Sequence, residues 1–240
     1  QKNTSATVII DDPVTQNDVW NLRKSGLGLL LSKRSYSRAI AFIEDIAVPH
    51  KMLAPFTEQL ICCLQKHGKD AGIYGHIGDG CLHIRPYINL LDSHDMAIME
   101  TILQEIAILV KSFHGVLSAE HGDGLIRSYL NKIMFGETIY AAFTQIKHAF
   151  DPEFLMNPGK IVTDKAHREW LRLHPHSHIN KIETFLDFSN EGGFELAADL
   201  CNGNGACRKK EGVMCPSFQA TLDEKNSTRA RAQVLRSFIH

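Results

Sequence analysis

Apolar side chains recur at intervals of three or four positions in several stretches of the chain, and this period is typical of amphipathic helices. The longest such stretch covers 93–114, where methionine, leucine and isoleucine repeat up to Gly115, and Asp92 or Ser93 can serve as the N-cap. This stripe predicts a helix that packs on a core. Further helices are predicted over 12–31, 52–67, 128–134 and 137–150.

Between these helices lie shorter runs that are rich in β-branched and apolar residues. Residues 38–49 predict a core strand that ends at a proline, and 115–120 predict another short strand. The runs at 71–77 and 81–88 flank a Gly-Asp-Gly turn at 78–80, which predicts a β-hairpin. This order of elements indicates an α+β fold. We expect a mainly antiparallel, ferredoxin-like sheet with helices on one face, followed by a small helical region that contains cysteines.

The composition is that of an ordinary globular protein, with 44% apolar and 22% charged residues among 240. A formal net charge of −1 argues against non-specific nucleic-acid binding, which needs a clustered basic surface. No apolar run approaches the roughly 18 residues of a membrane-spanning helix. The chain begins without methionine or a signal sequence and stops inside an apolar helical pattern, so we expect a piece of a longer polypeptide.

The six cysteines fall into distinct settings. Cys62 and Cys63 are adjacent inside a predicted helix, where buried thiols are the simplest interpretation. Cys201, Cys207 and Cys215 cluster within fifteen residues near the end of the chain. This spacing differs from the even spacing of a disulfide-stapled secreted domain. We therefore expect a reducing, cytoplasmic compartment, with any membrane association made through an electron-transfer partner.

Histidines and one glutamate mark a candidate site. His76 and His83 lie on the two arms of the predicted hairpin, so the reversal of the chain can aim both imidazoles the same way. Glu120 and His121 end another predicted strand. Two imidazoles, one carboxylate and open positions are the composition of a catalytic divalent-metal centre. With thirteen histidines in the chain, the alternative is that these histidines only satisfy a polar core.

Three motifs together carry a resemblance to a known family. The sequences "YGHIGDGCLHIRP", "SAEHGDGLIR" and "NPGKI", in this order, resemble the C-terminal substrate domain of the FAD-linked oxidases. That family includes D-lactate, glycolate and D-2-hydroxyglutarate dehydrogenases. The similarity runs over residues 6–162, and "VWNLRKSGLGLL" and "FIEDIAVP" also look like the family's approach to its site.

The resemblance assigns roles to individual residues. It implies that His76, His83 and Glu120 bind a divalent metal, zinc or manganese, and that His121 is the general base. It also implies that Arg23 binds the substrate carboxylate. Two departures from the family pattern are visible, and the second bears on the substrate. Cys81 stands where an asparagine is common, and a lysine that some relatives have near "FIED" is absent.

The same resemblance implies a flavin and a division into domains. Asn157 and Lys160 match family positions near FAD, which is expected to be held mainly by an N-terminal domain absent from this chain. We expect the substrate and metal domain over 1–163, a connecting segment over 164–192, and the start of a truncated iron–sulfur domain over 193–240.

The last cysteines carry a second resemblance. "MCPSFQATLDE" and "STRARAQVLR" resemble the opening of the ferredoxin-type domain fused behind some FAD-linked oxidases. Cys201, Cys207 and Cys215 would then ligate a 4Fe-4S cluster in the full-length protein. Three thiolates are one short of the four that such a cluster needs, so we expect no intact cluster in this fragment. A zinc site of three cysteines and a histidine, or three unliganded thiols, are the alternatives.

These inferences predict the substrate- and metal-binding portion of a flavin-dependent dehydrogenase. It would oxidise a D-2-hydroxy acid of the D-2-hydroxyglutarate or D-lactate type and pass electrons to an iron–sulfur module. The expected partners are the hydroxy acid, the N-terminal FAD domain, the iron–sulfur remainder, an unidentified electron acceptor and a second copy of the chain. A divalent-metal hydrolase and a non-catalytic redox-docking module are the alternatives.

Overall fold

The computed structural model describes residues 8–166 and 168–240. The chain divides into two compact units. One unit consists of Ser35–Glu183 with Phe238–His240, and the other consists of the described residues up to Arg34 with Thr184–Ser237. The domain boundaries expected after 163 and 192 stay predictions.

The larger unit is built around one long strand, β4 (Cys81–Asn89). Strand β3 (Ala71–His76) pairs antiparallel with it along one edge. The two short strands β1 (Ser37–Ala39) and β2 (Asp45–Ala47) both pair antiparallel along the other edge. The predicted hairpin is therefore confirmed, and its Gly-Asp-Gly turn brings Gly80 to a φ of 69°, a left-handed conformation that suits glycine.

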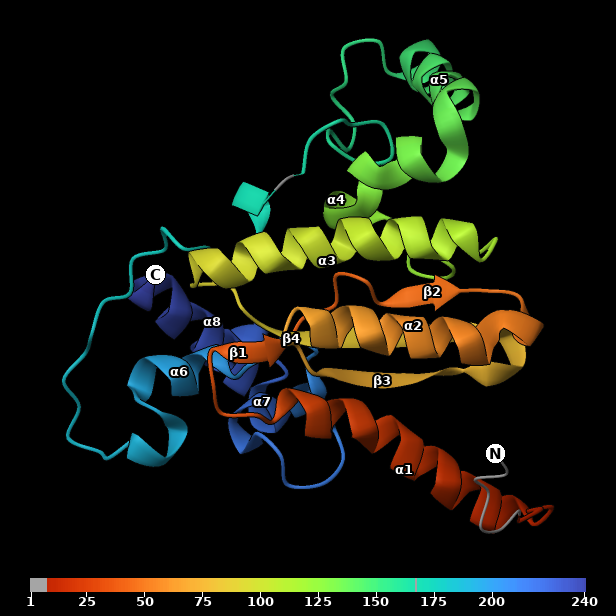
Figure 1. The fold of residues 1–240 in the computed structure, drawn as a ribbon. Coiled ribbons are helices and arrows are strands. Elements are labelled where there is room, and N and C mark those ends of the chain that lie inside the picture. Colours follow the sequence, from red (N-terminus) through yellow and green to blue (C-terminus); the bar gives the residue numbers. More distant parts are fainter. Residues whose placement is uncertain (1–7, 167) are drawn as a thin grey trace. The chain divides into compact units, whose positions relative to one another are not determined.

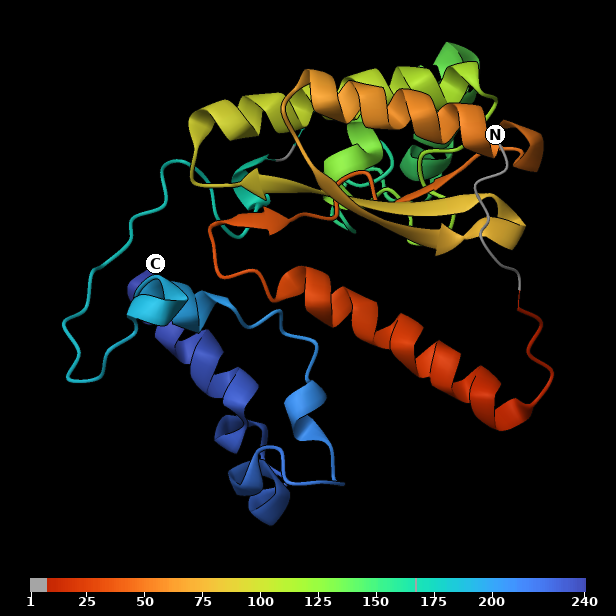
Figure 2. The ribbon, with the colours of Figure 1, turned by 60° about the horizontal axis from the view of Figure 1, so that its bottom comes forward.

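Two helices cover one face of this sheet, as Figures 1 and 2 show. They are α2 (Leu53–Lys66) and α3 (Ser93–Ser112), and both match the predicted helices closely. The Met and Leu stripe of α3 is buried, as expected for a core helix. The core that these helices share with the sheet includes Phe42, Ile46, Phe56, Leu60, Leu64, Leu82, Ile84, Ile88, Met96, Met99, Ile102, Leu103, Ile106 and Val110.

The pairing order is ferredoxin-like, as predicted. Val116 forms a β-bridge to Ala47 in β2, so the order across the sheet is Val116, β2, β4 and β3. With α2 and α3 on the same face, this is a βαββαβ arrangement whose last strand is reduced to a single bridge. The strand predicted over 115–120 is wrong beyond Val116, because the backbone there turns toward the Asp45 carboxylate instead of continuing the ladder.

The single strand predicted over 38–49 is also wrong. The five residues 40–44 lie opposite only three residues of β4, 84–86. The chain therefore bulges between β1 and β2. The physical reason is that consecutive Phe42 and Ile43 are both buried, which strict strand alternation does not allow.

Two helices continue the larger unit after the bridge at Val116. They are α4 (Gly124–Arg127) and α5 (Asn131–Phe150), the latter seen rising away from α3 in Figure 1. Gly136 interrupts α5 with a φ of 80°, between the two predicted helices. A segment without regular structure follows over 151–162, as the Pro and Gly residues there predict.

The smaller unit is helical. It holds α1 (Pro13–Leu31), α6 (Phe194–Asp199), α7 (Pro216–Thr221) and most of α8 (Thr228–Ile239). Asp12 caps α1 through its carboxylate, which accepts the N–H of Thr15 at 2.8 Å. The buried carboxylate of Asp199 pairs with Arg236 at 2.5 Å and ties α6 to α8.

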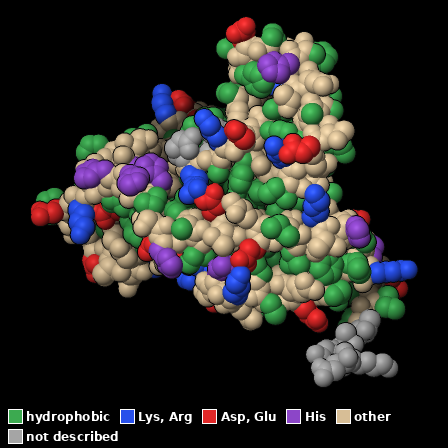
Figure 3. Space-filling model, turned by 45° about the horizontal axis from the view of Figure 1, so that its top comes forward, with side chains coloured by type: hydrophobic (Ala, Val, Ile, Leu, Met, Phe, Trp, Pro, Cys, Tyr) green, Lys and Arg blue, Asp and Glu red, His purple; other side chains and the backbone are tan. Residues whose placement is uncertain are grey.

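No helix in the described part of the chain has the length and apolarity that crossing a bilayer requires. Basic and acidic side chains lie interspersed on the face shown in Figure 3, in keeping with the formal net charge of −1.

A largely buried ion pair between Lys69 and Asp95 holds the start of α3 in place. It makes the stability of the fold depend on pH in a testable way. Partial burial opposes ionisation of Asp95, but the Lys69 ammonium at 2.5 Å and the backbone N–H of Asn89 at 2.9 Å outweigh it and lower the Asp95 pKa. A lowered carboxyl pKa contributes stability above the usual value of about 3.9, and that stability is lost as the pH falls through the lowered pKa.

We therefore expect Asp95→Asn to cost about 1.5–3 kcal/mol of unfolding free energy at pH 7. The difference from the unsubstituted chain should begin to shrink as the pH falls below about 4, and it should be smallest below the lowered Asp95 pKa, where the carboxyl is protonated in both folded and unfolded chains. Urea unfolding at a series of pH values measures this. Glu137→Gln, in an exposed pair with Lys132, is the control and should leave the curve unchanged. A difference that stays constant with pH would contradict the prediction.

Candidate metal centre and active site

The β-hairpin brings two of the predicted metal ligands together. His76 ends β3 and His83 lies in β4, where it pairs with Tyr74 of β3 and with Asp45 of β2. Gly75 is required here, because a Cβ at this position would lie 2.3 Å from the carbonyl oxygen of Cys81. The two imidazole rings lie edge to face, with centroids 5.3 Å apart.

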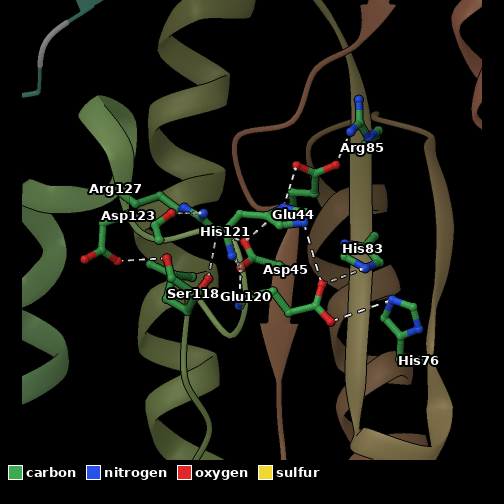
Figure 4. A network of polar contacts seen from close by, with 12 residues as sticks. Glu44, Asp45, His76, His83, Arg85, Ser118, Glu120, His121, Asp123 and Arg127 are labelled. Carbon is green, nitrogen blue, oxygen red and sulfur yellow. Dashed lines mark hydrogen bonds and ion pairs between the residues drawn. The ribbon is translucent and has the colours of Figure 1, made fainter. Parts of the chain in front are cut away.

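Glu120 completes the set from a different part of the chain, as Figure 4 shows. Its Oε1 lies 3.7 Å from Nε2 of His76, and its Oε2 lies 3.5 Å from Nε2 of His83. One donor atom from each of the three residues lies within 4.8 Å of the other two. Zinc binds imidazole nitrogen and carboxylate oxygen at about 2.0–2.2 Å, so this set fits a single divalent ion after small movements. The predicted ligands do converge.

The three ligands differ in exposure. His83 is only 3% exposed, whereas the side chains of His76 and Glu120 are partly open to solvent. Burial, against the opposing charges of Glu120 and Glu44, lowers the pKa of His83, so its imidazole is neutral at pH 7. Neutral imidazole is the form that binds metal. The site is therefore closed on the β4 side and open where a further ligand can enter.

His121 stands beside this set. Its ring stacks on His83 with centroids 5.3 Å apart, and its Nε2 lies 3.6 Å from Oε2 of Glu120. Its other nitrogen, Nδ1, lies 3.2 Å from Oε2 of Glu44. If Nδ1 carries the proton and donates it to Glu44, Nε2 is left as a base that faces the metal ligands.

Glu44 is a site residue that the sequence analysis missed. It interacts with Arg85 and lies 3.4 Å from the hydroxyl of Tyr74, so its carboxylate is held from three sides. In the sequence, the motif "FIED" indicates only the end of a strand and a family likeness. The only sequence signal for Glu44 is that a charged residue directly follows the apolar residues Phe42 and Ile43. A strand position that faces solvent would give the same pattern.

Asp45 organises the loop that carries Glu120 and His121. Its side chain is fully buried, and Oδ2 accepts the backbone N–H of Glu120 at 2.8 Å and of His121 at 2.7 Å. Its Oδ1 accepts from Arg127 at 2.5 Å, and its backbone carbonyl accepts from Ala119 at 2.8 Å. Burial opposes ionisation of Asp45, but the donors to its carboxylate from His121, Glu120 and Arg127 outweigh it and lower its pKa. Arg127 thus pairs with Asp45, which the sequence did not identify.

Residues 1–161 match the family described as FAD linked oxidases, C-terminal domain. The chain belongs to this family.

Individual relatives match over most of the chain. D-2-hydroxyglutarate dehydrogenases from Pantoea ananatis and Pseudomonas putida are 33% and 34% identical over 227 and 226 residues. Each alignment covers 92% of this chain but 22% of the relative, so the chain spans about a fifth of the length of these curated relatives. A D-lactate dehydrogenase from Archaeoglobus fulgidus is 30% identical over 118 residues, which is 49% of this chain and 26% of that protein.

The alignments with the first two relatives extend past the family match. Residues 1–161 make up much less than 92% of the chain, so these alignments must continue beyond residue 161. They therefore include much of the cysteine-containing region 193–240. The cysteine region therefore has a counterpart in proteins of this family.

A pocket lies next to the candidate metal ligands, with His121 in its lining. It has a volume of ≈ 760 Å³ and runs from His121 to Asn157 and Lys160. Its walls are mainly apolar and include Phe143, Ile146 and Met156. The structure thus places both predicted flavin contacts in one pocket with the predicted base. Lys160 donates to Oδ1 of Asn157 at 3.3 Å.

Two further residues that the sequence analysis singled out are Arg23 and Cys81. Arg23 lies on α1, in the smaller unit, so its role at the carboxylate stays a prediction. Cys81, which stands at the family's asparagine position, is 2% exposed. Burial, together with Glu120 and Asp45, raises the pKa of its thiol to about 11, so it is protonated at neutral pH.

The three late cysteines lie in the smaller unit. None of the six cysteines, all in the described part of the chain, forms a disulfide. A hydrogen bond to Glu224 is the main cause that raises the pKa of Arg229, and the charges of Cys207 and Cys201 add to it. Arg229 also donates to the carbonyl of Gly203, between these two cysteines in the chain, at 3.0 Å. Sγ of Cys215 accepts the N–H of Thr228 at 3.3 Å. Hydrogen bonds from Thr228, Phe218 and Ser217 outweigh desolvation and lower the Cys215 pKa to about 7.

The buried carboxylate of Asp45 gives a stability prediction. Asp45→Ala would leave Arg127 and two backbone N–H groups without their acceptor, and we expect a loss of about 3–5 kcal/mol of unfolding free energy, measured by urea unfolding. Asp79→Ala, in the exposed hairpin turn, is the control and should change stability by less than about 0.5 kcal/mol. A loss below about 1 kcal/mol for Asp45→Ala would show that the loop does not depend on this carboxylate.

Proposed function

We propose that this chain is the substrate- and metal-binding part of a FAD-dependent dehydrogenase that oxidises a D-2-hydroxy acid to the 2-oxo acid. The observation that carries the proposal is the convergence of His76, His83 and Glu120 with His121 beside them. Family membership supports the flavin, and the names of the relatives support the class of substrate. D-2-hydroxyglutarate is the favoured acid, and D-lactate is the second.

The metal and the base have separate tasks in this proposal. His76, His83 and Glu120 would hold the divalent ion, zinc or manganese, which when bound polarises the 2-hydroxyl and lowers its pKa. His121 then accepts the hydroxyl proton at Nε2, close to the Glu120 carboxylate. Glu44 accepts the Nδ1–H of His121 and so keeps the ring in the tautomer that has a free Nε2.

The flavin and the substrate are assigned to the neighbouring surfaces. The pocket beside His121 would receive the flavin edge, with Asn157 and Lys160 as contacts, and FAD supplies the hydride acceptor. We propose that a separate FAD-binding domain holds most of the cofactor. Arg23 would bind the substrate carboxylate.

Manganese binding tests the metal centre without requiring activity. We expect the chain to bind Mn²⁺, with His83→Ala and Glu120→Gln each weakening binding at least about tenfold, as followed by electron paramagnetic resonance. His94→Ala, at an exposed position on α3, is the matched control. Added D-2-hydroxyglutarate should alter the spectrum of the bound ion, and His121→Asn should preserve that change.

Two results would contradict the proposal. If Mn²⁺ binding is the same in His83→Ala, these residues are only structural. If the metal-loaded chain hydrolyses esters or amides in a His121-dependent way and no hydroxy acid perturbs the ion, the centre is that of a hydrolase.

We also propose that Cys201, Cys207 and Cys215 ligate a 4Fe-4S cluster together with a ligand outside this set. The hydrogen bond from Arg229 to Gly203, in the loop between Cys201 and Cys207, and the N–H donated to Cys215 support it, since charge and hydrogen bonds stabilise cluster thiolates. A zinc ion is less well supported, because these thiols do not form a group of donors within 4.8 Å among the described residues. In this proposal the cluster receives electrons from the flavin.

Anaerobic reconstitution with iron and sulfide tests this assignment in the full-length protein. We expect a 4Fe-4S absorption and paramagnetic signal that Cys201→Ser, Cys207→Ser and Cys215→Ser each abolish, while Cys62→Ser leaves it intact. In the 240-residue chain we expect no stable cluster. A full-length signal that survives all three substitutions would assign the cluster to other residues.

We also propose a cellular compartment and an oligomeric state for the protein. The grouped thiols favour a reducing, cytoplasmic setting, with contact to a membrane through the electron acceptor. Association of two copies of the chain is a further proposal that light scattering can test.

A further inference from the structure

A second set of metal-binding side chains lies between α2 and α3, away from the strands that build the first centre. Cys63 and His67 are four residues apart at the end of α2, so they lie on the same side of the helix. Glu105 faces them from α3. None of these three residues has a part in the function proposed above.

The three donor atoms converge on one point. Oε2 of Glu105 lies 3.0 Å from Nε2 of His67 and 3.4 Å from Sγ of Cys63, and one donor atom from each residue lies within 4.8 Å of the others. Zinc binds sulfur at about 2.3 Å and nitrogen or oxygen at about 2.0–2.2 Å in a tetrahedron, so its donors are roughly 3.3–3.7 Å apart. The observed distances need only small adjustment.

Lys66 orients the carboxylate without blocking it. Its ammonium lies 2.7 Å from Oε1 of Glu105, which leaves Oε2 directed at Cys63 and His67. Metal-binding carboxylates commonly have the second oxygen held in this way. An ion at this point therefore needs no rupture of the Lys66–Glu105 pair.

The site is also accessible and chemically selective. A shallow hollow of ≈ 360 Å³ lined by Cys63, Lys66 and Glu105 opens to solvent and gives an ion and its water a path. Thiolate, imidazole and carboxylate together suit zinc better than magnesium, calcium or manganese. Burial and the Glu105 charge raise the pKa of Cys63 to about 11, so binding at neutral pH must release the thiol proton to solvent.

We propose that Cys63, His67 and Glu105 bind a zinc ion that links α2 to α3, with water at the fourth position. The ion stabilises the helix pair, since it binds three donors that only the folded chain brings together. This proposal is independent of the dehydrogenase proposal, because it uses different helices and different donors.

Cobalt, a spectroscopic substitute for zinc, tests the site. The background variant carries Cys201→Ser, Cys207→Ser and Cys215→Ser, which removes the other cysteine cluster. We expect added Co²⁺ to produce a sulfur-to-cobalt charge-transfer band in this background. Cys63→Ser should abolish the band, and Glu105→Gln or His67→Gln should weaken Co²⁺ binding at least about tenfold. Cys62→Ser, at the exposed neighbouring thiol, is the matched control and should retain the band.

Thermal unfolding provides a second measurement. In the same background with His76→Ala and His83→Ala added, Zn²⁺ should still raise the melting temperature, and Glu105→Gln should remove that rise. Absence of the charge-transfer band, or its survival in Cys63→Ser, would overturn the proposal. Loss of Mn²⁺ binding at the first centre would leave this proposal standing, so the two proposals fail separately.

Discussion

The buried pair of Asp45 and Arg127 is the interaction on which the candidate active site depends. The Asp45 carboxylate accepts the backbone N–H groups of Glu120 and His121, and Arg127 also donates to the carbonyls of Leu117 and Gly122. One ion pair thus fixes both ends of the loop that supplies the acid and the base. A buried charge pair is costly, and it persists where its remaining hydrogen-bonding capacity is satisfied, as it is here.

The candidate site combines two residues on a rigid hairpin with two residues on a loop that hydrogen bonds hold in place. His76 and His83 belong to a hairpin whose register sets their spacing, while Glu120 and His121 follow a single β-bridge. The close approach at that bridge requires glycine, because a Cβ on Gly115 would lie 2.5 Å from the carbonyl oxygen of Ala47. Ladder hydrogen bonds hold the first pair and side-chain hydrogen bonds hold the second. The fold itself therefore holds one donor atom each of His76, His83 and Glu120 within 4.8 Å of one another.

The chain separates three kinds of donor chemistry. The first candidate centre offers imidazole and carboxylate, and the cluster between α2 and α3 adds one thiol to these. The smaller unit contains three thiols, two of which act on the charge of Arg229. Nitrogen and oxygen donors suit Lewis-acid chemistry on an alcohol, whereas thiolates suit zinc or iron–sulfur ligation. A chain that spans 22% of its relatives thus carries candidate donor sets that would favour different metals.

The sequence by itself determined the helices, the hairpin and the meeting of His76 with His83, because these depend on periodicity and on pairing between neighbours in the chain. Residue chemistry also marked Glu120 and His121 as candidates, and the family motifs distinguished the metal ligand from the base. Only the tertiary structure decided that Asp45 pairs with Arg127, 82 residues away, and that Glu105 faces Cys63. Such partners are chosen by packing between distant elements, which local patterns do not encode. The bulge at 40–44 belongs to the same class, since it depends on fitting Phe42 and Ile43 into one core.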